Sequence, residues 1–363
     1  MKKLKSDKRR QSIISRQRLY SDIHFKEWKK KSRRLLISVP KKSRNVELER
    51  RRKKLKKEQL NKIFAPVNFS FNKNTNEVVE FIRKIEILYQ NGKGVYVDLR
   101  LVEHIDYGSI VSLLSILIQF RRKRININGN FPEDKGCEKI LRESGFIYNL
   151  FSNKRDDERY CIENGGHNSI TTYGWKKVDT ALSAKIINES SMTIWDDERR
   201  CQGVQRCIGE LMLNTNNHAR PGQKGALNWW LYVNHDAERK IVSFAFVDFG
   251  IGIFESLKNK PSDSKFFGWL EKVKNKILNM DNGKILKMIM SGEFHSTVTG
   301  KYYRGKGLPG IAEAFRRNQL SNLLIVSNNA VGDLAKDEYM VIDSSFNGTY
   351  IYWELNEENE YCI

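Results

Sequence analysis

The sequence predicts an α/β fold of the α+β kind, with two folded domains behind a basic N-terminal segment. Three observations indicate this. Apolar residues recur at helical spacing, short apolar strands separate these stretches, and positive charge is concentrated at one end. The 363 residues are 40% hydrophobic, enough to bury two cores of ordinary size. We expect a basic arm over 1–62, a smaller α/β domain over 64–155, a linker over 156–184 and a larger α/β domain over 185–363.

The arm holds most of the net charge of +21. Residues 1–62 contain 25 Lys and Arg against 6 Asp and Glu, whereas the remainder contains 39 against 37. Like charges at this density repel one another and do not close a core, so we expect a helical or disordered segment. Lys and Arg on phosphates release counterions, which favours a DNA- or RNA-binding arm. A merely solubilising tail is the alternative. The expected contacts are Lys29, Lys30, Lys31, Arg33, Arg34, Arg50, Arg51, Arg52, Lys53, Lys54, Lys56 and Lys57.

Cysteine usage and hydropathy indicate the compartment. The five cysteines are scattered, odd in number and without a Cys-x-x-Cys pair, which is typical of free thiols in a reducing cytoplasm. The longest apolar run, Ile110 to Phe120, falls short of the roughly 20 residues that a membrane span needs. We therefore expect a cytoplasmic protein with no membrane partner.

The smaller domain shows strand and helix patterns in alternation. Residues 75–91 carry apolar positions at helical spacing, and a short buried strand follows at 94–99. A second helix is expected to open at 105–110, a second strand at 124–129, and a third helix at 137–145, ended by a glycine. Strand, helix, strand and helix in this order predict parallel strands with crossover helices.

This order resembles the STAS domain of anti-anti-sigma factors. The strand ending at Asp98, the Ile105-Asp106 pair and the Leu141 to Phe146 stretch carry the resemblance. In that family a phosphorylatable Ser stands at the start of the following helix. Here Gly108 occupies the acceptor position and Ser109 falls one residue late. We therefore expect a structural or docking module for a protein partner, in which Asp106 caps a helix.

The larger domain contains an unusual helix. Apolar residues recur at i, i+4, i+7 and i+11 over 204–215, whereas Glu210, Asn214 and Asn217 share a different face. Asn competes with the backbone for hydrogen bonds and weakens a helix, so two amides beside a carboxylate need a reason. A solvated face is one reason, and a polar binding site is the other.

Three further motifs follow this helix in order. An apolar strand runs into Asp248-Phe249-Gly250-Ile251-Gly252, a glycine-rich stretch spans 304–310, and a strand opens with Gly348-Thr349. In this order the four motifs resemble the nucleotide site of the GHKL ATPases, which include gyrase B, a class of heat-shock chaperones, MutL repair proteins and histidine-kinase catalytic domains. The resemblance covers about residues 180–356 and implies a Bergerat-type α/β sandwich. Ordinary turns are the alternative for the glycines and for Asp248.

The resemblance also implies roles for single residues. Asp248 would accept a hydrogen bond from the adenine amine, with Thr349 beside the pocket and Gly250 and Gly252 letting the chain pass under the base. Asn214 would hold Mg²⁺, which bridges the phosphates of ATP. The remaining ATP-binding positions are Asn217, Gly305, Lys306, Gly307 and Gly310.

Glu210 is the expected general base that aligns the attacking water, since an ionised carboxylate can accept a proton. The alternative is that Glu210 only shapes the phosphate site. Residues 253–305 correspond to the ATP lid of the resembled family, and the glycines beyond them to a loop that leads into a helix N-terminus near Ile311.

The leading hypothesis is a Mg²⁺-dependent ATPase in which nucleotide-driven lid closure switches nucleic-acid or protein binding through the arm. One alternative is an anti-sigma-type serine protein kinase that acts as a partner-switching regulator. Another is an ATP-binding scaffold that does not hydrolyse ATP. The resemblance also implies a homodimer as one assembly.

Overall fold

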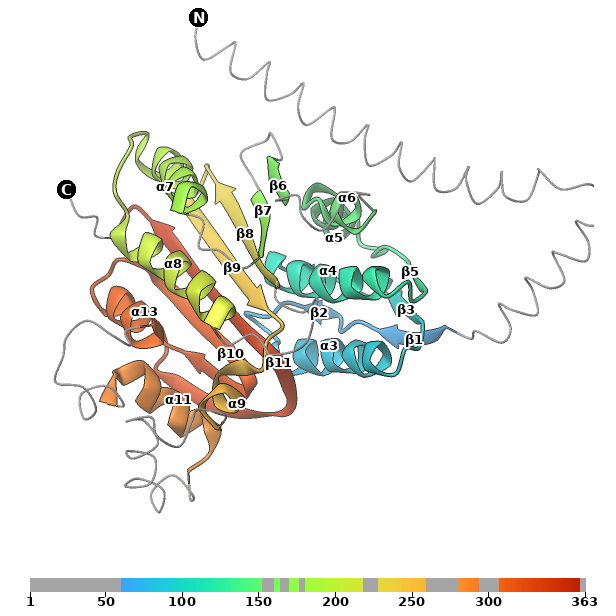
Figure 1. Ribbon diagram of the computed structural model, residues 1–363. Helices are drawn as coiled ribbons and strands as arrows, with labels where there is room; N and C mark the ends of the chain where they lie inside the picture. Colours follow the sequence, from blue (N-terminus) through green and yellow to red (C-terminus); the bar gives the residue numbers. More distant parts are fainter. Residues whose placement is uncertain are drawn as a thin grey trace, which may run out of the picture. The chain divides into compact units, whose positions relative to one another are not determined.

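The computed structural model describes residues 60–151, 160–163, 170–175, 180–217, 228–258, 280–293 and 307–359. It is a mixture of helices and strands, as the α/β prediction requires (Figure 1). Contacts divide the chain into two compact units. Among the described residues, the first unit comprises 60–70 and 84–151, and the second comprises 71–83, 160–163 and those from 170 onward. None of the helices within the described ranges is long and apolar enough to cross a membrane.

The first unit is built on a parallel three-stranded sheet in the order β1-β3-β5, so the expected parallel pairing is confirmed. A second parallel pair joins β2 to β4. The strands are β1 (Asn61–Phe64), β2 (Asn68–Phe69), β3 (Val95–Asp98), β4 (His104–Ile105) and β5 (Ile127–Gly129). The helices are α3 (Thr75–Gln90), α4 (Tyr107–Arg122), α5 (Lys135–Glu143) and α6 (Phe146–Phe151), of which α3 passes from the second unit into the first at residue 83.

Two of the expected helix signals in this unit are confirmed. The carboxylate of Asp106 accepts a hydrogen bond from the backbone N–H of Ser109 at 2.7 Å, which makes it the N-cap of α4. Gly145 has a positive φ of 76° just beyond α5, as a helix-ending glycine should. Strand β5 begins later than expected, because Arg124 adopts a left-handed φ of 56° that a strand does not accommodate.

A buried carboxylate ties the ends of the three parallel strands together. Asp98, at the end of β3, is 3% exposed and lies 2.8 Å from the Nζ of Lys62 on β1 and 2.9 Å from Arg100. The Nδ2 of Asn130, which follows β5, donates to the same carboxylate at 2.8 Å. Arg100, together with Lys62 and Asn130, holds the pKa of Asp98 well below its ordinary value. Asp98 is therefore a structural ion-pair centre.

The second unit contains a six-stranded antiparallel sheet in the order β10-β11-β9-β8-β7-β6. Its strands are β6 (Tyr160–Glu163), β7 (Ile170–Trp175), β8 (Asn228–Asp236), β9 (Ile241–Asp248), β10 (Ser321–Asp333) and β11 (Glu338–Asn356). The described helices are α7 (Thr180–Trp195), α8 (Gln202–Asn217), α9 (Gly252–Lys258), α11 (Asn282–Ser291) and α13 (Gly307–Arg316).

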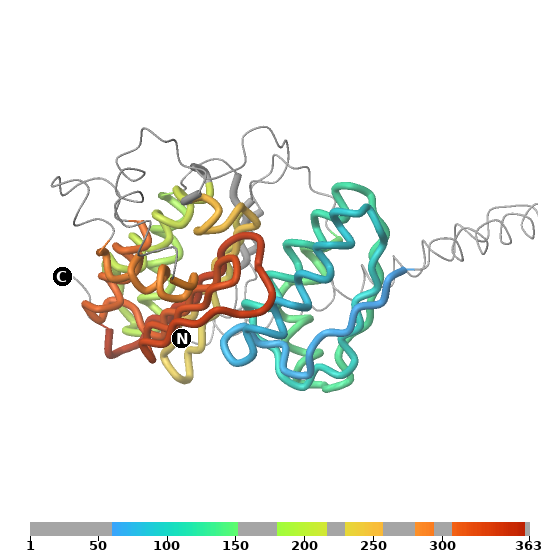
Figure 2. The backbone as a smooth tube through the Cα atoms, turned by 90° about the horizontal axis from the view of Figure 1, so that it is seen from below, coloured from blue at the N-terminus to red at the C-terminus, as the bar shows by residue number. Residues whose placement is uncertain are grey.

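These helices and the sheet share one apolar core. Val204 and Ile208 from α8 join Phe244 and Phe246 from β9 and Trp353 from β11, all fully buried. The ring of Phe244 stacks on Trp353 with centroids 5.0 Å apart. Figure 1 shows α7, α8 and α13 along the sheet, and Figure 2 shows the orange segments α11 and α13 beside the red strands β10 and β11. The apolar stripe predicted for α8 is therefore its buried face.

The stretch expected to be a linker, residues 156–184, is different in the structure. It contributes β6 and β7 to the sheet and the start of α7, and β7 pairs with β8 from Ile170 opposite Val233 to Trp175 opposite Asn228. Charged residues and a Gly-Gly pair surround β6, so the composition of this stretch was typical of a linker. The sequence of β7, Ile-Thr-Thr-Tyr-Gly-Trp, is nevertheless rich in β-branched and aromatic residues, which favour a strand.

Candidate functional site

The carboxylate predicted to recognise a base stands at the end of a buried strand. Asp248 is the last residue of β9 and lies opposite Thr349 of β11 in the sheet register. Its Oδ1 accepts the backbone N–H of Gly250 at 2.8 Å, and the side chain and backbone of Thr349 also hydrogen-bond to it. Burial, only partly offset by these bonds, raises the pKa of Asp248 to about 6. The structure thus brings Asp248, Gly250 and Thr349 together.

The turn after Asp248 is held by β10. Gly252 has a φ of 77°, and a side chain there would meet the amide of Asn328 at 2.4 Å. Asn328 accepts the N–H of Phe254 at 3.1 Å and donates to the carbonyl of Ile251 at 3.1 Å. The hydroxyl of Ser327 accepts the N–H of Ile253 at 2.9 Å. The predicted glycine turn is therefore anchored to the sheet at several points.

Sequence reasoning missed Ser327 and Asn328. Both are buried in the apolar strand β10, at 0% and 7% exposure. Buried polar side chains are satisfied by hydrogen bonds in folded proteins, so a polar pair inside an apolar strand was a usable signal. The sequence could not show which segment Ser327 and Asn328 bind, because β10 lies some 75 residues beyond the turn that it holds.

A second cluster forms where α8 packs against α13. A side chain on Gly307 would lie 3.3 Å from the Nδ2 of Asn214, so the polar face of α8 meets the first residue of α13. A side chain on Gly310 would lie 3.1 Å from the Nε of Arg206. Arg206 and Glu210 are four residues apart, as are Glu210 and Asn214, and all three are partly buried. In Figure 1 the C-terminal ends of α8 and β9 lie at the same end of the sheet.

Arg206 is the third residue that sequence reasoning missed, although its spacing from Glu210 and Asn214 was visible. Within the part of the chain that the structure describes, neither Arg206 nor Glu210 forms an ion pair or a hydrogen bond through its side chain. A guanidinium carries a full positive charge and a helix N-terminus carries a partial one, so the two together favour an anion.

The start of α13 corrects one expectation. Gly307 and Gly310 were expected in a loop that leads to a helix near Ile311, but both lie in the first turn of α13. Pro309 explains this, because proline is tolerated in the first turn, where its missing N–H would have no partner.

Several expected site residues lie outside the described residues. These are Gly305, Lys306, the side chain of Asn217 and every Lys and Arg expected in the basic arm. In the first unit Ser109, one residue beyond the acceptor position, is 0% exposed. A kinase would have no access to its hydroxyl in this fold.

The arrangement offers two kinds of recognition. Asp248 presents a carboxylate acceptor beside a hydroxyl, which suits an amine-bearing ring edge. The α8–α13 contact presents a helix N-terminus, an amide and a guanidinium, which suit an anion.

No family model matches the chain, and neither a curated protein nor a solved structure with significant similarity was found.

Replacing Asp248 by Asn should stabilise the protein at high pH. Asp248 has a pKa raised from 3.8 to about 6, so the folded state takes up a proton that the unfolded state releases between these values. Stability therefore falls as pH rises to about 6 and stays lower above it, by up to about 3 kcal/mol. The variant should have a higher Tm at pH 8, and the gain should vanish near pH 4.

Asp98→Asn is the matched control, with the opposite sign. The lowered pKa of Asp98 contributes stability above the unfolded value, and this contribution is lost as pH falls. The control should have a lower Tm at pH 8. Thermal melts of both variants from pH 4 to pH 8 check the pair, and a Tm loss for Asp248→Asn at pH 8 would contradict the assignment of a costly buried charge.

Gly348→Ala should disrupt the Asp248–Thr349 contact. Gly348 has a φ of 135°, and an added Cβ would lie 1.9 Å from the carbonyl oxygen of Asp248. We expect a loss of more than about 2 kcal/mol in the free energy of unfolding. Gly209→Ala on α8 is the control, because nothing lies within 4 Å of its added Cβ. Alanine favours a helix, so this control should gain up to about 1 kcal/mol in urea unfolding.

Proposed function

We propose that the second unit is a GHKL-type module of Bergerat architecture that binds Mg²⁺-ATP and hydrolyses it. The observation that carries this proposal is the Asp248 carboxylate at the end of β9, hydrogen-bonded to Gly250 and to Thr349 of the neighbouring strand. Helices on an antiparallel sheet, with α8 against the first turn of α13, provide the matching surroundings.

The Asp248 cluster fits adenine. A carboxylate has about four acceptor positions, and the hydrogen bonds from Gly250 and Thr349 leave capacity for an amine N–H. A pKa of about 6 keeps the group ionised at neutral pH, so it can only accept. Guanine would direct a carbonyl oxygen at the same carboxylate, and this repulsion favours adenine.

The α8–α13 cluster fits the phosphates. The amide oxygen of Asn214 is a hard ligand of the kind that Mg²⁺ takes, and the metal ion would supply charge neutralisation at the triphosphate. Arg206 and the N-terminus of α13 add positive charge beside it. Glu210 lies between Arg206 and Asn214 on the same face of α8 and supplies a carboxylate that can accept a proton from water.

The proposal extends to the rest of the chain. Nucleotide binding would close the segment between α9 and α13 and thereby change how a partner is held. The basic arm would contact DNA or RNA, and the first unit would act as a STAS-like docking module. The inaccessible Ser109 favours this module over a phosphorylated partner-switching element.

ATP turnover and ATP binding separate the proposed roles. Glu210→Ala should lower the rate of hydrolysis by about 100-fold or more while leaving ATP affinity within a few fold. Asp248→Asn should weaken ATP binding by about tenfold or more, because one hydrogen bond to a charged group is lost. Asp343→Asn, an exposed carboxylate on β11, is the control and should change neither quantity.

The measurements are phosphate release and equilibrium binding of ATP, ADP and GTP with Mg²⁺. Binding without turnover in the wild type would favour a scaffold, and transfer of labelled γ-phosphate to a protein would favour a kinase. Failure of the wild type to bind any of these nucleotides would overturn the proposal.

Removal of the arm should weaken nucleic-acid binding without changing ATP affinity. The truncation should stop at residue 58, because Asn61 and Lys62 belong to β1 and Lys62 pairs with Asp98. We expect lower retention on DNA, RNA and heparin and a shallower dependence of affinity on salt. Filter binding between low and physiological salt checks this, and unchanged retention would rule out the arm as the contact.

A further inference from the structure

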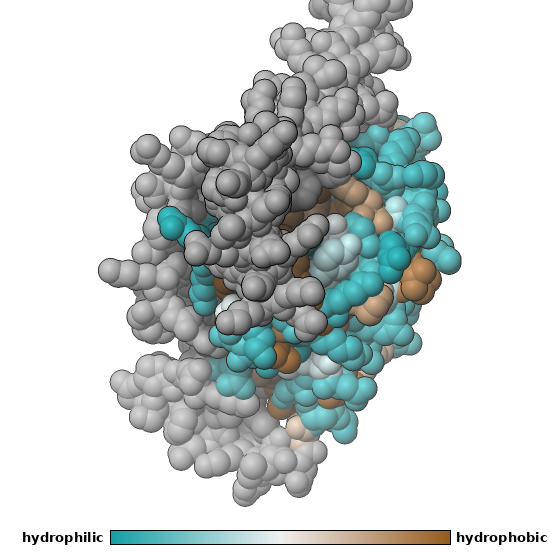
Figure 3. All heavy atoms as spheres, turned by 90° about the vertical axis from the view of Figure 1, so that its right-hand side faces the viewer, coloured by the Kyte–Doolittle hydropathy of each residue, from teal (hydrophilic) through white to brown (hydrophobic). Residues whose placement is uncertain are grey.

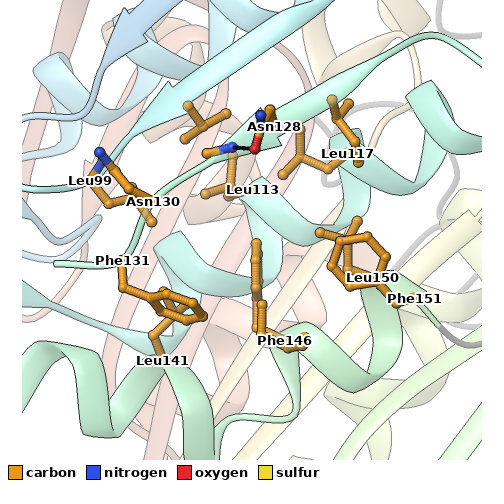
Figure 4. A pocket seen from close by; sticks show the side chains of 14 residues that line it. Leu99, Leu113, Leu117, Asn128, Asn130, Phe131, Leu141, Phe146, Leu150 and Phe151 are labelled. Atoms are coloured by element: carbon orange, nitrogen blue, oxygen red, sulfur yellow. Dashed lines mark hydrogen bonds between the residues drawn. The ribbon is translucent and has the colours of Figure 1, made fainter. Parts of the chain in front are cut away.

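A partly open apolar pocket of about 130 Å³, referred to below as the cavity, lies in the first unit, and all of its lining residues belong to that unit. Figure 4 shows Leu113 and Leu117 of α4 and the β5 end on one side, with Leu141 of α5 and Phe146 of α6 facing them across the space. All four of these side chains are 5% exposed or less. The walls come from a sheet and three helices, so the space is shaped by the fold and not by one loop.

The cavity offers almost no polar group to a guest. Its lining among the described residues contains no charged side chain, and the oxygens of its two polar side chains already accept hydrogen bonds. Asn130 accepts the N–H of Leu99 at 2.7 Å and donates to Asp98 at 2.8 Å. The Oδ1 of Asn128 accepts the N–H of Gly129 at 2.8 Å. A charged guest would lose its hydration without compensation, whereas an apolar guest would not.

The neighbouring edge strand is poorly suited to an added peptide strand. Strand β5 has only three residues, and the residues on either side of it are bonded to β3, because the carbonyl of Asn126 accepts from Val95 and the N–H of Asn130 donates to Val97. The N–H of Gly129 is taken by the Asn128 side chain, which leaves little of a hydrogen-bonding ladder. The face of the molecule visible in Figure 3 is mostly hydrophilic among its described residues, with small hydrophobic areas. A small molecule fits these features better than a protein does.

We propose that this cavity binds a small, uncharged apolar molecule or group, of the size of a substituted benzene ring or a short branched chain. An enclosed apolar cavity of about 150 Å³ in another protein takes up benzene, and the partly open pocket here, of about 130 Å³, is of comparable size. The first unit would thereby sense a ligand through its core, independently of nucleotide binding in the second unit.

Methyl NMR of the full-length chain tests this directly. Titration with toluene should shift the methyl resonances of Leu113, Leu117 and Leu141, whereas the exposed Ile87 and Leu101 should not shift. Benzoate has nearly the same shape but carries a charge, and it should bind at least about tenfold more weakly than toluene.

Two filled variants keep the test decisive if one of them fails to fold. Leu113→Phe and Leu141→Phe fill the cavity from opposite walls, and each should weaken toluene binding by about tenfold or more. Ile87→Phe adds the same ring on the outer face of α3 and should leave binding unchanged. Equal toluene affinity in the wild type and both filled variants would overturn the proposal. Shifts produced only by an extended apolar peptide, and strengthened by Asn128→Ala, would overturn it in favour of strand addition to β5.

Discussion

The partly buried carboxylate of Asp248 is the constraint around which its neighbouring strands are arranged. Asp248 receives hydrogen bonds from Gly250 and Thr349, yet desolvation outweighs these bonds and raises its pKa to about 6. Bringing Thr349 to this position requires Gly348, whose missing side chain lets β11 approach the Asp248 carbonyl. Ser327 in turn donates to the carbonyl of Gly348 at 2.7 Å. Three adjacent strands are thus adjusted to hold one destabilising group, which is the pattern expected of a binding site.

The two aspartates that end buried strands show why geometry, and not sequence, separates a structural role from a functional one. Asp98 and Asp248 both follow short apolar strands and precede turns. Lys62 and Arg100 neutralise Asp98, so its charge stabilises the fold and has little left to offer a ligand. Among the described residues, the donors to Asp248 come from Gly250 and Thr349 and are neutral, so its charge is not compensated in the same way. Whether such an aspartate is neutralised depends on which strand lies beside it in the sheet. The order of strands in a sheet is a non-local property and cannot be read from the residues around the aspartate.

Local patterns predicted local structure well. The apolar stripe of α8, the Asp106 cap and the parallel order of β3 and β5 follow from spacing and residue type, and all three are present. The contact of Asp248 with Thr349 could be predicted only through family resemblance, because the two residues are about 100 positions apart. The missed residues share one property: Ser327, Asn328 and Arg206 act on segments distant in sequence. Strands β6 and β7 were missed because their stability comes from pairing in the sheet, which overrides a polar, glycine-containing composition.

The first unit has no accessible serine hydroxyl at the start of α4, but α4 lines an apolar pocket. Gly108 has no hydroxyl, and Ser109 is enclosed at the start of α4. This pocket is the cavity of about 130 Å³ described above. Leu113 and Leu117 line this cavity and lie on α4, the helix that also carries Ser109, so a bound guest would contact α4 on its buried face. The proposed ligand would therefore act on α4 through its apolar side chains and would require no modification at the N-terminus of the helix.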